Sequence, residues 1–382
     1  MRLSAVIAVI LLAGAAPPTA AQGVIGAAGL GYPHGGLSSR VLGSGGAAAE
    51  LDPASALNPA ALSQVATFEV HSQMNVERRT SVVASPSTTS VIPTFPHTGF
   101  TLAISSRWVF GLSTSSLLDR SWGNTTEAVI SLDGIDVVAR DRATSEGGLN
   151  DVRLAVAYRL TPRLAVGAGG HFISGENRIE LVRTFVDAPE YGVARQRALI
   201  DYSGSAYSAG LVYAPTDALV FGASAQIGGS LDASEFGEVV GSGSTPARAG
   251  GSVQYSLPGS VFSARVGWSR WSDLDGFSDR AGVTPSTLDA RDGMEYGIGA
   301  DLDGPSMLGA PTVLRVGFAR RDLPFRVAGH DVAENRISGG MGIPLAQGRA
   351  LLDIAVVRAA RTGVAGASET GWITSVGLVL RP

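Results

Sequence analysis

From residue 66 onward, apolar residues alternate with small or polar residues along stretches as long as whole β-strands. Residues 164–172 read LAVGAGGHF, in which Leu164, Val166 and Phe172 fall on one face and His171 on the other. Similar alternation recurs in 219–227, 262–269 and 314–319. Successive side chains of a strand point to opposite faces, so this period predicts strands with one apolar face.

The composition indicates that the apolar face meets lipid. Charged residues make up 16% of the chain, against about 25% in a typical soluble protein, and 50 of the 382 residues are glycine. After the N-terminus no run reaches the ~18 apolar residues of a candidate spanning helix. The remaining way to cross a membrane is a closed β-barrel. Arg265 and Arg315 alternate with the apolar residues, as expected of side chains that face water or protein.

The first 21 residues have the order of a secretory signal peptide. A basic start precedes the apolar run Ser4 to Ala16, which is followed by two prolines and the small residues Ala20 and Ala21. We expect cleavage between Ala21 and Gln22. The alternative, a membrane anchor, needs an apolar run of ~20 residues. The chain has no cysteine, so neither a lipid-anchored lipoprotein nor a disulfide is expected.

Short and long connections alternate along the chain. Short turns with Pro, Gly or Asp lie in 158–169, 213–224, 255–266 and 343–354, whereas 119–150, 272–293 and 321–334 are long and polar. Short periplasmic turns and long external loops are typical of bacterial outer-membrane barrels. This alternation of short and long connections therefore supports an outer-membrane barrel formed by residues 64–382. The alternative is a soluble sandwich or propeller.

The predicted fold is all-β, an antiparallel transmembrane barrel of about fourteen strands, with both ends on the periplasmic side. The strands are expected at 66–84, 97–106, 108–130, 136–160, 163–186, 195–213, 217–240, 247–256, 260–271, 293–302, 312–321, 335–344, 349–359 and 369–380.

Residues 22–63 do not alternate. Asp52-Pro53 and Asn58-Pro59 each resemble a helix start, with a capping side chain followed by proline at the first helical position. A barrel of this size is wider than its own side chains can fill. With few charges and apolar residues at Leu51, Leu57 and Leu62, the segment is predicted to plug the lumen. The alternative is a disordered periplasmic tail.

The stretch GSGGAAAELDPASALNPAALS resembles the N-terminal signature of the FadL-like transporters of long-chain fatty acids and of the related PorV-like shuttles of type IX secretion. The match runs through Gly46, Ala47, Ala48, Asp52, Ala54, Ser55, Asn58, Pro59, Ala60 and Leu62. The resemblance implies a fourteen-stranded barrel whose N-terminal segment is a hatch containing Asn58, Pro59 and Ala60. Two departures are Ala56, where the family often has an aromatic residue, and the chain end Arg381-Pro382, where an aromatic residue is common.

The function that this resemblance implies is transport of hydrophobic small molecules, fatty acid-like or hydrocarbon-like, through a hatch-gated barrel. Capture sites for such solutes are concave and mostly apolar. The candidate residues lie in polar loops and are Trp122, Trp271, Leu274 and Phe277. A tryptophan near a strand end is alternatively an interfacial anchor. The expected partners are outer-membrane lipids and a hydrophobic solute, with the protein a monomer.

Other function classes have less support. A PorV-like shuttle would bind exported proteins at its outer rim. An enzyme is not expected, because the five histidines are scattered and none has the spacing of a metal site. Asp273, Asp275 and Asp279 are loosely spaced like calcium ligands but lack the full pattern, so no metal or other cofactor is predicted. The net charge of −4, with mixed signs, gives no indication of nucleic-acid binding. A diffusion porin would require the hatch to be displaced.

Overall fold

The computed structural model describes residue 25 and residues 31–83, 87–132, 134–186, 188–275, 277, 289–307, 309–327, 329–364 and 367–381. The predicted signal peptide, residues 1–21, lies outside these residues. Within these described residues, seventeen strands form one antiparallel sheet. They are β1 (Tyr32–Pro33), β2 (Phe68–Val83), β3 (Ser87–Ala103), β4 (Trp108–Asp119), β5 (Trp122–Leu132), β6 (Ile135–Thr161), β7 (Leu164–Phe185), β8 (Ala194–Tyr213), β9 (Leu219–Glu235), β10 (Glu238–Ser244), β11 (Ala247–Leu257), β12 (Ser260–Arg270), β13 (Gly293–Met307), β14 (Ala310–Val327), β15 (His330–Leu345), β16 (Ala350–Val364) and β17 (Ala367–Leu380).

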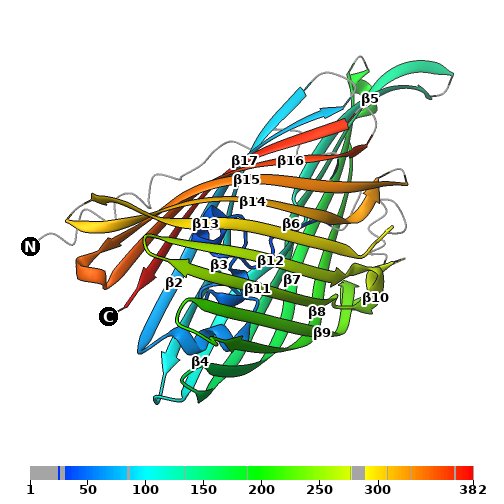
Figure 1. Cartoon of the computed structure of the whole chain (residues 1–382). Helices are drawn as coiled ribbons and strands as arrows, with labels where there is room; N and C mark the ends of the chain where they lie inside the picture. The colour runs from blue at the N-terminus through cyan, green and yellow to red at the C-terminus, as the bar shows by residue number, and fades with distance from the viewer. Residues whose placement is uncertain are drawn as a thin grey trace, which may run out of the picture.

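The sheet closes into a barrel because the last strand pairs with the first long one, from Leu380↔Val70 to Ala367↔Val83. Fourteen strands form the ring, and β1, β5 and β10 lie outside it. The predicted transmembrane barrel of about fourteen strands is thereby confirmed. Figure 1 shows the tilted strands around the N-terminal residues.

The two rims of the barrel differ. We call the rim with the tight turns β6–β7, β8–β9 and β11–β12 the turn rim, and the opposite one the loop rim. Both β2 and the C-terminal strand β17 meet the turn rim, since Val70 pairs with Leu380. Strands β6 and β7 are 27 and 22 residues long and rise above the other strands at the loop rim. One side of the barrel wall is therefore much taller.

Several predicted boundaries are wrong. The strand expected at 97–106 begins at Ser87, and residues 119–150, expected as a long connection, form β5 and the first part of β6. Three further differences have local reasons. The expected strand 108–130 is two strands, because the extended conformation is interrupted at Arg120, between β4 and β5. The expected strand 217–240 is a hairpin of β9 and β10, whose turn uses positive φ at Phe236 (52°) and Gly237 (84°). The polar stretch 321–334, expected as a loop, extends β14 and β15 to a short connection.

The outer face of the ring is apolar. In β14, Leu314, Val316 and Phe318 are exposed, while Arg315 between them is buried inside. Exposed aromatic residues form two bands, as in the aromatic girdles of membrane barrels. The band near the turn rim includes Phe100, Trp108, Tyr213, Tyr255 and Phe262, and the band nearer the loop rim includes Phe172, Tyr207, Tyr296 and Trp372.

Residues 31–67, here called the N-terminal segment, lie against the inner face of the ring (Figure 1). After the short strand β1 they form α2 (Ser39–Gly43) and the 3₁₀ turns η2 (Ala49–Leu51) and η3 (Pro59–Gln64). Helix α2 packs on β15, β16 and β17, η2 on β9 and β11, and η3 on β4, β6, β7 and β8. Three further 3₁₀ turns lie in the connections of the barrel: η4 (Pro189–Tyr191), η5 (Trp271–Leu274) and η6 (Ala346–Gly348). In the described residues, no helix is long and apolar enough to cross a membrane.

Candidate functional site

The local structure of the N-terminal segment follows from its caps. Asn58 caps η3, with its Oδ1 accepting from the Ala60 N–H at 2.9 Å, and Pro59 stands at the first helical position. The helix start expected at Asn58 is therefore confirmed. Asp52-Pro53 forms a turn instead, because the Asp52 carboxylate accepts the Ser55 hydroxyl at 2.8 Å rather than capping a helix.

The segment approaches the wall closely where the wall residue is glycine. A Cβ added to Gly222 would lie 2.7 Å from the carbonyl oxygen of Glu50. One added to Gly167 would lie 2.5 Å from the amide nitrogen of Ala60. Glycine lets two backbones approach this closely because it has no side chain. The fit of the segment therefore depends on inward-facing glycines from several strands.

Buried polar contacts fix the segment to the wall. The Asn58 side-chain amide donates to the carbonyl oxygens of Glu50 at 2.6 Å and Leu211 at 3.0 Å. Arg159 of β6 donates to the carbonyl oxygens of Ser63 at 2.7 Å and Val65 at 2.8 Å. All six residues of the predicted hatch motif are buried, namely Asp52, Ser55, Asn58, Pro59, Ala60 and Leu62.

Above the segment, toward the loop rim, lies an apolar group that we call the loop-rim cluster. Its members are Leu117, Leu118, Leu149, Ile173, Ile179, Ala198, Ile200, Tyr202, Leu231, Ala233, Trp271, Leu274, Phe277 and Ala290. The 3₁₀ turn η5 brings Trp271 and Leu274 into it.

Three of the four candidate capture residues thus lie together. Trp271 is 4% exposed within this cluster, rather than at a lipid interface as an anchor would be. Trp122 is also buried but lies on β5, opposite Ser145 of β6, and is not a member of the cluster.

Polar side chains form a layer between the loop-rim cluster and the N-terminal segment. They face inward from β6, β7, β8, β9 and β11, and strand register aligns Arg153 with His171 and Gln226 with Arg248. We call this the arginine layer; its members are Asp151, Arg153, His171, Ser208, Gln226 and Arg248.

Within the arginine layer, His171 is hydrogen-bonded on both sides, whereas some donors of Arg153 and Gln226 have no partner among the described residues. His171 Nδ1 is 2.9 Å from the Asp151 carboxylate, and its Nε2 is 2.8 Å from the Ser208 hydroxyl. Within the described part of the chain, Nε and Nη1 of Arg153 and Nε2 of Gln226 have no hydrogen-bond partner. Because a buried donor without a partner is costly, these groups are suited to an acceptor on a ligand.

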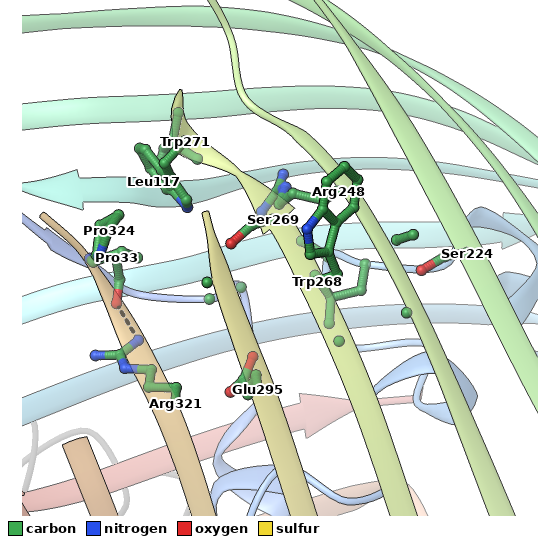
Figure 2. A pocket seen from close by; sticks show the side chains of 18 of the residues that line it. Pro33, Leu117, Ser224, Arg248, Trp268, Ser269, Trp271, Glu295, Arg321 and Pro324 are labelled. Carbon is green, nitrogen blue, oxygen red and sulfur yellow. Dashed lines mark hydrogen bonds between the residues drawn. The ribbon is translucent and has the colours of Figure 1, made fainter. Parts of the chain in front are cut away.

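A cavity of about 90 Å³ lies where the apolar and polar parts meet. Leu117 and Trp271 contribute apolar surface, and Arg248 and Arg265 contribute guanidinium groups. Figure 2 shows Leu117 and Trp271 together on one side of the cavity, apart from Glu295 and Arg321. Pockets for small organic ligands usually have ~300 Å³ or more. The described conformation is therefore closed to a solute of that size.

The wall is interrupted between β3 and β4. Their pairing runs from Ala103↔Val109 to His97↔Ser115 and, in the residues the structure covers, goes no further. Beyond that point β1 pairs with β4 instead, through Tyr32↔Asp119, and His34 N donates to Leu117 O at 3.4 Å. The N-terminal segment thus covers an edge of the wall as well as lying in the lumen.

His34 lies at this edge with its imidazole buried, which disfavours the charged form. Burial lowers the pKa of His34 from its ordinary value, although Asp119 nearby favours the charged form. A neutral imidazole here adds no charge where β1 meets β4.

The sequence did not reveal the arginine layer. Alternation within single strands places Arg153 and Arg248 on inner faces, and that signal alone could have identified them. Their proximity depends on the register of strands far apart in the sequence. Among the described residues, no group of three or more His, Asp and Glu side chains is placed to hold a metal ion.

No family model and no curated protein matches this sequence. Solved structures do match. A Pseudomonas aeruginosa FadL homologue is 12% identical, with a TM-score of 0.63 over 92% of this chain and 99% of its own. The Pseudomonas putida toluene transporter TodX is 16% identical, with a TM-score of 0.58 over 91% of this chain and 98% of its own.

The monoaromatic hydrocarbon channel CymD is 15% identical, with a TM-score of 0.57 over 91% of this chain and 98% of its own. These likenesses extend over nearly the whole length of each protein. The chain therefore has the FadL-like fold of an outer-membrane β-barrel.

Proposed function

We propose that this protein is a channel of the bacterial outer membrane that takes up hydrophobic compounds carrying an anionic head group. The observation that supports this most is the cavity between the loop-rim cluster and the arginine layer. An apolar chain would pack on Leu117, Trp271 and Leu274. Its head group would accept hydrogen bonds from Arg248, which lines the cavity, and from Arg153 of the same polar layer.

The arginine layer favours a carboxylate over a plain hydrocarbon. The Asp151 carboxylate lies 3.8 Å from Arg248 and is already bonded to His171, while Nε and Nη1 of Arg153 have no hydrogen-bond partner among the described residues. Guanidinium groups bind carboxylates through paired hydrogen bonds. A hydrocarbon would leave the donors of Arg153 unpaired. Of the two solute classes expected from the sequence, the fatty acid-like class therefore fits better.

The N-terminal segment is the proposed gate. It occupies the lumen below the cavity, and through β1 it covers the edge of β4. Moving this segment would enlarge the cavity and expose the interruption between β3 and β4 in a single step. The domain division that follows is a gate over residues 22–63 and a barrel over 64–382, with residues 22–24 and 26–30 outside the described part.

The outer surface offers a place for release into the membrane. An apolar groove of about 600 Å³ lies on the outer face of β2, β3, β4 and β6, where β3 and β4 are still paired just below the interruption. Phe100 and Leu112 line it and are exposed. A solute leaving sideways would enter apolar surroundings and avoid water.

Structures with this fold are described as a FadL homologue and as transporters or channels for toluene and monoaromatic hydrocarbons. Uptake of hydrophobic solutes is thus the activity named for proteins of this architecture. The outer-membrane location agrees with the apolar outer face and its two aromatic bands.

The test uses vesicles that contain either the mature chain or a chain lacking residues 22–63. Uptake of a long-chain fatty acid is compared with that of its methyl ester, and ionic current is recorded in parallel. We expect the intact protein to be electrically closed and to prefer the acid, and the deletion to conduct ions. Equal uptake of acid and ester would overturn the head-group assignment.

If the deletion conducts but the intact protein moves neither compound, the gated channel is wrong. The segment would then be a fixed plug, and the PorV-like shuttle would become the better account. No contact in the described residues favours that alternative at present.

A further inference from the structure

The ring of Tyr32 is held in the way that a protein holds a bound aromatic ligand. Guanidinium carbons of Arg79 and Arg361 lie over the ring, 4.5 and 4.3 Å from its centre. The Phe325 ring meets it edge-on at 6.2 Å, and its hydroxyl donates to Glu369 Oε1 at 2.9 Å. Two cations over one ring, with an acceptor for its hydroxyl, form a specific site for a phenol.

The four side chains that hold the ring and the hydroxyl of Tyr32 belong to the barrel wall. They lie on β2, β14, β16 and β17, and carboxylates of the wall orient both guanidinium groups. Arg79 Nη2 lies 2.9 Å from Glu77, and Arg361 Nε lies 2.6 Å from Glu334. Because these pairs do not involve Tyr32, the site would keep its shape if the tyrosine left. Such preorganisation favours the binding of another ligand.

The site also suits a neutral phenol. Burial raises the pKa of Tyr32 well above its ordinary value, and the charge of Glu369 acts in the same direction. The occupant therefore keeps its proton, and its O–H donates a hydrogen bond to Glu369. A cavity of about 50 Å³ adjoins the ring and is lined by Tyr32, His34, Arg79 and Arg361.

We propose that the Tyr32 position is a phenol-binding site, and that a free phenolic compound competes with Tyr32 for it. Since Tyr32 belongs to β1, its displacement would free the edge of β4 and release the N-terminal segment. The release step rests on the proposed gating function, whereas the binding step does not. This site is formed by other residues than the arginine layer, so its ligand acts on the gate and is distinct from the transported solute.

The binding test uses p-cresol, which is the tyrosine side chain as a free molecule. Toluene, which lacks the hydroxyl, is the matched control. In detergent solution we expect Tyr32→Ala to bind one p-cresol at least ten-fold more tightly than the wild type, and at least ten-fold more tightly than it binds toluene. Equal affinity of wild type and variant, or no preference over toluene, overturns the site.

The release test exploits the absence of cysteine. Leu37→Cys introduces one thiol at a position that is 4% exposed in the N-terminal segment, and its maleimide labelling rate reports release. We expect p-cresol to raise the rate several-fold in the single-cysteine protein, and Tyr32→Phe to lower the p-cresol concentration required. Tyr32→Phe keeps the ring, so it is expected to fold normally.

An unchanged labelling rate at saturating p-cresol, in both Leu37→Cys proteins, would overturn the proposed release of the N-terminal segment. Neither test requires transport. If p-cresol binds and labelling rises but no uptake is observed, the phenol site stands and the proposed uptake function fails.

Discussion

Glu50 of the N-terminal segment and Arg265 of β12 form a buried ion pair, with Arg265 Nε 3.0 Å from both carboxylate oxygens of Glu50. The two side chains are only 1% and 7% exposed. Glu295 of β13 holds another nitrogen of the same guanidinium at 2.7 Å. The pair therefore joins the segment to the wall through a charge that water does not screen.

Removing one partner of this pair should loosen the segment. Breaking a buried ion pair by removing one partner costs up to about 3–5 kcal/mol, and here Glu295 still compensates part of the Arg265 charge. We expect Glu50→Ala to raise the leak current of reconstituted protein by at least ten-fold. The matched control is Glu50→Ala with Arg265→Met, which removes both charges and should restore much of the closed state. An equal leak in single and double variants would contradict the pairing argument.

The second prediction concerns the close contact between Gly167 of the wall and the backbone of Ala60. Gly167→Ala places a Cβ where the backbone of Ala60 lies, and overpacking of this kind costs about 1–3 kcal/mol. We expect the variant to label faster at Leu37→Cys while the barrel remains folded, as judged by its heat-modifiable migration on a gel. Gly170→Ala on the same strand is the control, because its Cβ would meet nothing within 4 Å. Identical behaviour of the two variants would show that the contact at Ala60 has little effect.

If the arginine layer binds the head group, replacing its arginines should reduce uptake only of solutes that carry an anionic head group. A hydrogen bond to a charged group contributes about 1.5–3 kcal/mol, which corresponds to a change in affinity of roughly 10- to 150-fold. Arg153→Met and Arg248→Met should each lower uptake of a fatty acid by at least ten-fold and leave uptake of its methyl ester nearly unchanged. The control is Arg178→Met, whose side chain is 63% exposed. Parallel losses for acid and ester would indicate a general defect rather than head-group recognition.

If the loop-rim cluster captures apolar chains, removing its side chains should slow capture. Truncating a buried leucine removes contacts worth about 2–5 kcal/mol. We expect Leu274→Ala with Phe277→Ala to reduce the initial rate of uptake at low solute concentration, with a smaller effect at saturation. Phe236→Ala removes an aromatic ring that is 89% exposed at the tip of the β9–β10 hairpin, so it serves as the control. Equal rates in the two proteins would argue against capture by the cluster.

Much of the fold could be predicted from the sequence because a barrel strand carries its own signal. Leu314, Val316 and Phe318 reveal their outward face without reference to any other strand. The hairpin at Phe236 and Gly237 was missed because alternation continues across it. Its turn depends on two residues with positive φ, and at Phe236 such a conformation is uncommon for a non-glycine residue.

The candidate site was predictable only in part. Trp271, Leu274 and Phe277 are near in sequence, so a loop-based prediction brought them together correctly. Arg153 and Arg248 are neighbours through the pairings of β6, β7, β8, β9 and β11. Tyr32 meets Arg361 across almost the full length of the chain. Such contacts follow from the register and closure of the ring, which no single strand encodes.

The position of α2 has a consequence for how the protein is made. This helix lies near the start of the chain, yet it packs on β15, β16 and β17, which are synthesised last. Its partners exist only when the final strands arrive, and β17 then pairs with β2, which begins four residues after η3 ends. The segment therefore reaches its final packing no earlier than the last strands, at the stage when the ring is sealed. A substitution that weakens its contacts with these strands would act twice, on the last step of assembly and on the proposed gate of the finished barrel.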